Sequence, residues 1–284
     1  LPAPAELQTD IDSQGVYVPG RNYNKIVSGR HGTGYQPPSR EQWQTLKKLR
    51  GVQSANLRGS QPTSVDNSKT PYFPPVGDQG TEGSCTAFSN AYYIHTYNEA
   101  REHNWNLTGT TWQSDPTGSS SAGRPSGNLD KIFSPDFVYH QINYGEDGGS
   151  GAQTAASLLV RLGCATWGQM AYNTSDHTSW PSERAWREAC RYRGRELANR
   201  YYDNVPVGYL VIRTDADIDL LKTLISSGYC VSTSIRAESP GLYELLDAND
   251  VVDDGDTAKM PTDHAQTIVG YKEGADWNKL KPDL

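Results

Sequence analysis

The sequence predicts a loop-rich α+β fold, with helices in the first part of the chain and strands in the second. Helical spacing of apolar residues comes first, and short β-branched segments follow after about residue 205. The 284 residues include 27 Gly and 17 Pro, which are typical of turns. Hydrophobic residues make up 35%, while 17 Tyr and 7 Trp supply large amphipathic core groups. Segregated helices and strands favour an α+β enzyme over a helical bundle.

The N-terminal region, residues 1–61, differs from the rest because it has few apolar residues and several turn signals, including Gly32-Thr33-Gly34. One short helix is predicted from its N-cap Ser39 to Leu49. Residues 53–69 are predicted to be a polar linker. With little core of its own, we expect this region to lie on another surface or to be mobile.

Apolar periodicity and turn signals predict the remaining elements in order. The predicted helices and strands are a buried helix 85–101, helices 134–139, 151–162, 181–201 and 217–226, and strands 208–213, 229–235 and 266–271. Gly163 ends the third of these helices, and Pro181 suits the first turn of the next. Residues 108–130 are predicted to be a Gly/Ser-rich surface loop.

The most informative segment delivers Cys85 from a Gly-rich turn onto the first residue of the buried helix. A helix N-terminus carries a partial positive charge and unpaired N–H groups, both of which stabilise a thiolate, the nucleophilic form of cysteine. Gln79, six residues upstream, could donate its amide to a developing oxyanion beside the Cys85 N–H. This pattern indicates nucleophilic catalysis.

This segment resembles the papain family of cysteine peptidases, in which Gln-Gly, three further residues and Ser-Cys-Trp-Ala-Phe-Ser have the same spacing. Here Thr86 replaces the aromatic residue and Glu82 replaces a structural Cys. The stretch from Tyr144 to Gly149 is similar to the family's Tyr-Gly-Cys-Asn-Gly-Gly, with Glu146 again at a Cys position. Those two Cys form one disulfide in the family, so the bridge is lost as a unit.

A third match, from Asp263 to Tyr271, resembles the family's His-Ala-x-x-x-Val-Gly-Tyr. The resemblance therefore spans about 62–271 and implies a papain-like fold of two subdomains, a helical half and a β-barrel-like half, with the active site in the cleft between them. It also implies that His264 forms the thiolate–imidazolium pair with Cys85 and then protonates the leaving amine. The implied substrate-binding residues are Gly148, Gly149 and Asp263, the last also a local structural carboxylate.

The expected domains follow from this alignment. Residues 62–284 form the peptidase domain, with a helical half at about 75–165 and a β-rich half at about 205–284. Residues 1–61 are expected to be a pro-segment or a cleft-covering extension. The family's Asn-Ser-Trp-Gly, whose Asn orients the imidazole, does not occur; Asn278 follows His264 by 14 residues in unmatched surroundings. We therefore expect the given chain to lack C-terminal strands.

Composition excludes several classes of function. The formal charge is −7 and no basic run occurs, so we expect no nucleic-acid partner. No apolar run is long enough for a membrane span. The other five histidines lack ligand spacing such as His-Glu-x-x-His, so we expect no metal and no cofactor. The acidic run 253–256 is predicted to be a solvated loop, with a Ca²⁺ contact as the alternative.

We expect a monomer that acts on peptide or protein substrates, that protein inhibitors could block, and that is secreted or sent to a lytic compartment. A Cys164–Cys190 disulfide is one reading of the remaining cysteines, and free thiols at Cys164, Cys190 and Cys230 are the other. Two alternatives to a peptidase stay open. One is a non-catalytic papain-fold binding protein, and the other is an enzyme that uses the same acyl chemistry as a transferase or isopeptidase.

Overall fold

The computed structural model describes residues 21–27, 31–48, 61–114, 122–194, 197–199, 202–205, 207–235, 237 and 262–273. Its helices are α2 Arg40–Thr45, η2 Asn67–Lys69, α3 Cys85–Ala87, η3 Phe88–His95, α4 Thr96–Glu102, α5 Pro135–Ile142, α6 Ala152–Arg161, α7 Glu183–Ala189 and α8 Asp215–Ser226. Its strands are β1 Ile26–Val27, β2 His31–Gly32, β3 Lys47–Lys48, β4 Ser64–Asp66, β5 Trp112–Gln113, β6 Arg124–Pro125, β7 Leu197–Asn199, β8 Tyr202–Val205, β9 Gly208–Tyr209, β10 Val231–Ile235, β11 His264–Ile268 and β12 Gly270–Lys272. The predicted loop 253–256, Asn278 and residues 53–60 of the predicted linker lie outside the described residues. The rest of that prediction, residues 61–69, is wrong, because this part of the chain includes β4 and η2.

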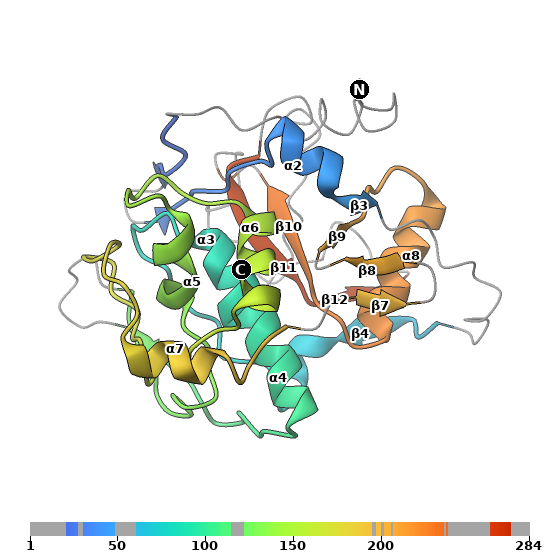
Figure 1. The fold of residues 1–284 in the computed structure, drawn as a ribbon. Coiled ribbons are helices and arrows are strands. Elements are labelled where there is room, and N and C mark those ends of the chain that lie inside the picture. Colours follow the sequence, from blue (N-terminus) through green and yellow to red (C-terminus); the bar gives the residue numbers. More distant parts are fainter. Residues whose placement is uncertain are drawn as a thin grey trace.

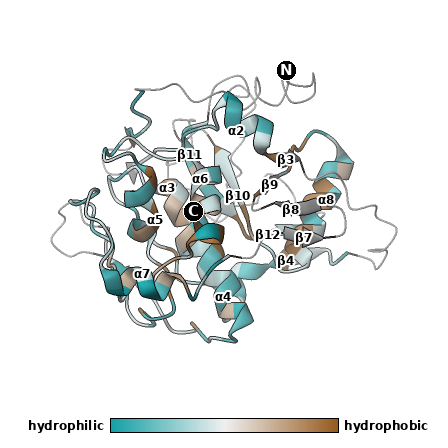
Figure 2. Cartoon of the chain, viewed as in Figure 1, coloured by the Kyte–Doolittle hydropathy of each residue, from teal (hydrophilic) through white to brown (hydrophobic). Residues whose placement is uncertain are grey.

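The α+β class is confirmed: α3 to α7 gather in one half, while β10 to β12 and α8 lie in the other (Figure 1). Aromatic and aliphatic side chains of α3, η3, α5, α6 and α7 build the core of the helical half. Phe133, Phe137 and Tyr139 are fully buried there. The outward-facing helices α4 and α7 are mostly hydrophilic (Figure 2). Among the described residues, no helix is both long and apolar enough to cross a bilayer.

The predicted buried helix is confirmed as a continuous run of α3, the π-helical η3 and α4, from Cys85 to Glu102. It packs against the β-rich half through small polar side chains. The Ser89 hydroxyl lies 2.9 Å from both the Ser232 hydroxyl and the Gln266 carbonyl oxygen. Such bonds satisfy polar groups that would be costly to bury alone. This contact fixes strands β10 and β11 against the helix that begins at Cys85.

Two predicted helices are wrong in length. The helix predicted over 181–201 ends at Ala189, and residues 197–199 and 202–205 pair instead as antiparallel strands β7 and β8. The cause is tertiary: the Tyr192 carbonyl accepts a hydrogen bond from the Cys164 N–H at 3.2 Å, which draws the chain across the end of α6. Similarly, α2 ends at Thr45 rather than Leu49, because β3 follows at once and pairs with β9.

In the β-rich half, β10 and β11 are antiparallel with Ile235 opposite His264. The strand predicted over 266–271 divides into β11 and β12. Strand β12 pairs with β4, which lies near the start of the predicted peptidase domain. The predicted strand 208–213 is reduced to β9. Helix α8 begins at Asp215, two residues before the predicted start, and its N-cap is Thr214, whose hydroxyl accepts a hydrogen bond from the Asp217 N–H. Within the described ranges the strands pair two at a time and close no barrel.

The N-terminal region contacts both halves. The Tyr23 N–H donates to the Gly148 carbonyl at 3.0 Å on the helical side. On the other side, β3 runs parallel to β9, and the Trp43 ring meets the Tyr209 ring edge-on at 5.1 Å. A reciprocal capping box at Ser39 fixes the start of α2 between these contacts. Figure 1 shows α2, in blue, lying over both halves.

Candidate active site

Cys85 is the first residue of α3 and lies at the junction of the two halves. Its side chain is almost completely buried, with 1% exposed. The backbone N–H of Ala265 on β11 donates a hydrogen bond to the Cys85 sulfur at 3.3 Å. The residue that follows His264 therefore contacts the sulfur directly, and the fold brings together two motifs that are 179 residues apart in the sequence.

Strand pairing sets the position of His264. It is the first residue of β11, opposite Ile235 of β10, and the preceding Asp263 N–H donates to the Ile235 carbonyl at 3.0 Å. The Asp263 carboxylate accepts a hydrogen bond from the Ala237 N–H at 2.7 Å. This contact holds Asp263 as the local structural carboxylate that the sequence predicts, so the entry of the chain into β11 is fixed.

The Cys85 thiol is held in its protonated form. Burial raises its pKa to about 12, and hydrogen bonds from the backbone N–H groups of Ala265, Thr86 and Cys85 itself oppose this shift. The nearby Asp263 carboxylate adds to the rise. A thiol with such a pKa is a poor nucleophile near neutral pH, because only the thiolate attacks.

Gln79 lies in the turn before α3, but its amide is already engaged. The Gln79 Nε2 donates to the Glu82 carbonyl at 2.8 Å and to the Gly32 carbonyl at 3.0 Å. The backbone carbonyl of Gln79 accepts a hydrogen bond from the Tyr172 hydroxyl at 2.7 Å. The turn is therefore well anchored. The Gln79 amide, which the sequence assigns to the oxyanion, donates one of its hydrogen bonds to the N-terminal region instead.

The Gly148–Gly149 stretch is joined to the turn before Cys85 through Asp147, which the sequence analysis did not single out. The Asp147 carboxylate accepts hydrogen bonds from the Gly83 N–H at 2.8 Å and from the Tyr139 hydroxyl at 2.7 Å. Hydrogen bonds to a charged acceptor are stronger than neutral ones. Asp147 therefore fixes the two loops that flank the nucleophile.

Residues 32–36, which we call the cover segment, run along these same groups. The N–H groups of Gly34 and Tyr35 donate to the Asp263 carbonyl at 2.9 and 2.8 Å. The Ser150 N–H donates to the Gly34 carbonyl at 2.8 Å, and the Gln36 N–H donates to the Ser150 carbonyl at 2.9 Å. Tyr35 and Ser150 form a parallel bridge. The cover segment is thus hydrogen-bonded to both halves beside Cys85.

Tyr35 packs in one buried apolar cluster with Cys85 and Ala265. The turn predicted at Gly32-Thr33-Gly34 is wrong, since Gly32 ends strand β2 and Tyr35 then forms the bridge with Ser150. The glycines serve close approach instead. A Cβ on Gly34, whose φ is +135°, would lie 2.3 Å from the Gly83 carbonyl oxygen, and one on Gly149 would lie 2.2 Å from that of Gly34.

The structure does not bring together the two other pairs that the sequence suggested, Glu82 with Glu146 and Cys164 with Cys190. Glu82 is fully buried, whereas Glu146 is exposed, so the two carboxylates that replace the family's disulfide do not meet. All four cysteines are free, so the predicted alternative of a Cys164–Cys190 bridge is wrong. Glu82 instead lies with Asp136 and His140 in a buried group that could hold a cation.

No protein-family model and no curated protein matches this sequence. The fold, however, is similar to those of solved cysteine proteases. Xylellain, a cysteine protease from Xylella fastidiosa, superposes with a TM-score of 0.53 at 17% identity, over 87% of this chain and 83% of that one. A structure from work on the mite allergens Blo t 1 and Der p 1 gives 0.50 at 16%, over 82% and 63%. Procathepsin L 3 of the Tenebrio molitor larval midgut gives 0.50 at 15%, over 80% and 61%.

The chain therefore has the papain-like fold, as the three sequence motifs predicted. At these identities the similarity concerns the fold alone.

Proposed function

We propose that this chain is a cysteine peptidase present in a covered, inactive form. The observation that carries the proposal is the hydrogen bond from the Ala265 N–H to the Cys85 sulfur at 3.3 Å. It sets a cysteine at the start of a helix against the strand that begins with His264, an arrangement suited to a thiolate–imidazolium pair.

In the reaction we propose, His264 takes the Cys85 proton and the thiolate attacks the carbonyl carbon of a peptide bond. The resulting oxyanion is stabilised by the Cys85 N–H and the Gln79 amide. His264 then gives its proton to the leaving amine, and a thioester acyl-enzyme remains. Water, deprotonated by His264, hydrolyses the thioester, which releases the acid and restores the thiol.

The cover segment supports the inactive form. Its backbone uses the Ser150 N–H and the carbonyls of Ser150 and Asp263, groups that an extended peptide substrate would need in order to bind beside Gly148 and Gly149. It also engages the Gln79 amide and buries Cys85, whose pKa is raised to about 12 mainly by that burial. Displacing the segment would free the donor, hydrate the thiol and allow the thiolate to form.

The test is labelling with an epoxide inhibitor of cysteine peptidases, read by peptide mass spectrometry. The intact chain and a sample cut between about residues 50 and 61 at acid pH are compared, with Cys85→Ala and Cys190→Ala as matched variants. We expect an adduct on Cys85 in the cut sample and peptide hydrolysis that the Cys85→Ala change abolishes. If Cys85 takes no adduct in the cut sample, the chain is no peptidase.

A second candidate is a non-catalytic papain-fold protein that binds peptides. The buried, protonated thiol under a well-bonded cover segment favours it. The same experiment separates the two candidates, because a binding protein would retain peptide after the cut without cleaving it. Secretion or delivery to a lytic compartment belongs to the proposed peptidase, and detection of the protein in the medium of expressing cells checks it.

A further inference from the structure

Three buried side chains converge behind the turn that carries the nucleophile. Glu82 comes from that turn, and Asp136 and His140 lie one helical turn apart on the same face of α5. The side chains are 0%, 1% and 3% exposed, respectively. One ligand atom from each lies within 4.8 Å of the others. None of these groups takes part in the chemistry proposed for Cys85.

The atoms that point into this group lack hydrogen bonds. They are both carboxylate oxygens of Glu82, Oδ1 of Asp136 and Nε2 of His140. His140 Nε2 lies 3.7 Å from Asp136 Oδ1, which exceeds hydrogen-bonding distance. Buried polar atoms are nearly always bonded, so four together indicate a missing partner.

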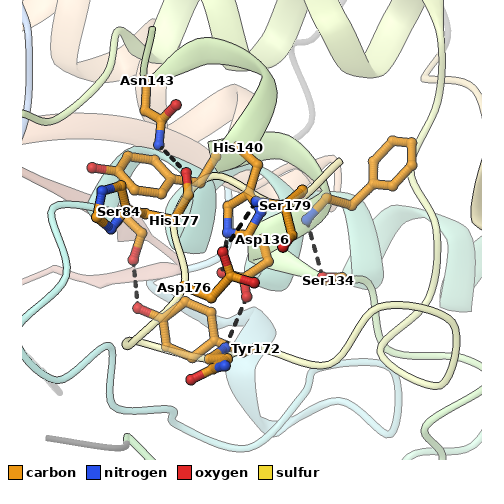
Figure 3. Close-up of polar contacts among 12 residues, drawn as sticks. Ser84, Ser134, Asp136, His140, Asn143, Tyr172, Asp176, His177 and Ser179 are labelled. Carbon is orange, nitrogen blue, oxygen red and sulfur yellow. Dashed lines mark hydrogen bonds and ion pairs between the residues drawn. The ribbon is translucent and has the colours of Figure 1, made fainter. Parts of the chain in front are cut away.

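The neighbouring donors are already used elsewhere (Figure 3). The Tyr172 hydroxyl donates its single proton to the Gln79 carbonyl, so in the 2.6 Å pair with Ser84 it is the serine that donates. The other oxygen of Asp136 accepts from the Asn173 N–H at 2.8 Å. No salt bridge to Lys or Arg is found for Glu82 or Asp136 within the described ranges.

The hydrogen bond of His140 determines which of its ring nitrogens carries the proton. Its Nδ1 lies 2.7 Å from the Ser179 carbonyl, which can only accept, so Nδ1 carries the proton. Nε2 of the neutral ring then carries a lone pair, 3.7 Å from Asp136 Oδ1. A metal-binding histidine typically donates its other N–H to a backbone carbonyl in this way.

We propose that Glu82, Asp136 and His140 form a buried site for one divalent metal ion of the zinc type, which fastens the turn before Cys85 to α5. Two carboxylates and a neutral imidazole carry a charge of −2, which a divalent cation balances. A ligand set of one nitrogen and two oxygens suits Zn²⁺ better than Ca²⁺ or Mg²⁺, which prefer oxygen alone. With Zn²⁺ bonds of about 2.1 Å in tetrahedral geometry the ligand atoms lie about 3.4 Å apart, so this group, whose ligand atoms lie within 4.8 Å of one another, must contract by up to about 1.4 Å on binding.

The alternative is that protons neutralise the two carboxylates, because burial raises the pKa values of both Glu82 and Asp136. The test must therefore separate metal from protons. It uses the full chain with Cys85→Ala, so that the thiol cannot bind metal and the result does not depend on peptidase activity. The chain is treated with a chelator, titrated with Zn²⁺ by calorimetry, and its metal content is measured by mass spectrometry.

We expect one equivalent of Zn²⁺ to bind and to raise Tm by roughly 5–10 °C at 100-fold excess over Kd. Glu82→Gln, Asp136→Asn and His140→Gln should each weaken binding at least about 100-fold. The exposed residues Glu146→Gln and His103→Gln are the matched controls and should bind normally. Absence of stoichiometric binding, or unchanged binding by the ligand variants, overturns the proposal in favour of protons.

If the ligand variants do not fold, Co²⁺ binding to the Cys85→Ala chain decides. We expect visible d–d bands and no thiolate charge-transfer band, since the proposed site holds only nitrogen and oxygen. A spectrum with a thiolate band would assign the metal to the remaining cysteines and overturn the proposal.

Discussion

The change Gly34→Val should displace the cover segment and expose Cys85. Gly34 has a φ of +135°, which disfavours any side chain, and a Cβ there would lie 2.3 Å from the Gly83 carbonyl oxygen. Because that oxygen belongs to the backbone, the cover segment itself must move. Its movement breaks the bonds from the Gly34 and Tyr35 N–H groups to Asp263 and from the Ser150 N–H to Gly34.

The magnitude follows from these contacts. Three backbone hydrogen bonds at about 1 kcal/mol each make about 3 kcal/mol, which corresponds to a roughly 150-fold larger open population. In the covered chain, with a pKa of about 12, the Cys85 thiolate fraction at pH 7.5 is about 10³-fold smaller than that of an ordinary thiol with a pKa near 8.5. Gly34→Val should therefore raise the reactivity of the Cys85 thiol about a hundredfold.

The assay is alkylation by iodoacetamide at pH 7.5, with the exposed free thiol of Cys190 as the internal standard. We expect Cys85 to react about 10³-fold more slowly than Cys190 in the natural sequence, and about tenfold more slowly after Gly34→Val. The control is Gly109→Val, where φ is +86° but no atom lies within 4 Å of the added Cβ. Equal labelling of Cys85 in both variants would refute the reasoning.

Three further predictions concern the site and its surroundings. In the cut enzyme, Gln79→Ala should lower kcat about 10²-fold without slowing alkylation of the nucleophile, as steady-state kinetics can check; a normal kcat would remove Gln79 from the oxyanion site. Asp147→Asn should cost about 1.5–3 kcal/mol in urea unfolding, because a charged acceptor for the Tyr139 hydroxyl is lost, whereas the exposed Asp130→Asn should cost little. Burial raises the pKa of Asp136 from about 4 to about 8, so the metal-free folded chain holds a proton that the unfolded chain releases; its stability is full below about pH 4 and is lost as the pH rises towards 8. Tm should therefore fall from pH 5 to pH 8 without Zn²⁺ and vary less with it, and a flat metal-free profile would contradict the assignment.

The local signals predicted most of the helical half. Ser134 before Pro135 and Thr214 before Asp215 are N-caps in the structure, because a short side-chain oxygen bonds a free N–H of the first turn whatever the tertiary context. The helix from Cys85 was predicted for a similar reason, since its apolar spacing is local. The helix predicted over 181–201 was wrong because its end depends on the Tyr192 carbonyl meeting Cys164, which no local pattern reveals.

By itself, the sequence determined the fold class and the motifs around Cys85 and His264, because a Gly-rich turn, a helix start and a strand start each leave a signature within a few residues. Only the tertiary structure decided that the segment around Tyr35 lies on the sulfur, and that Glu82 lies beside Asp136 and His140. Both depend on contacts between residues at least 50 positions apart, whose side chains show no periodicity in common. The protonation of the thiol follows from that burial, so it too was decided by packing and not by the motif.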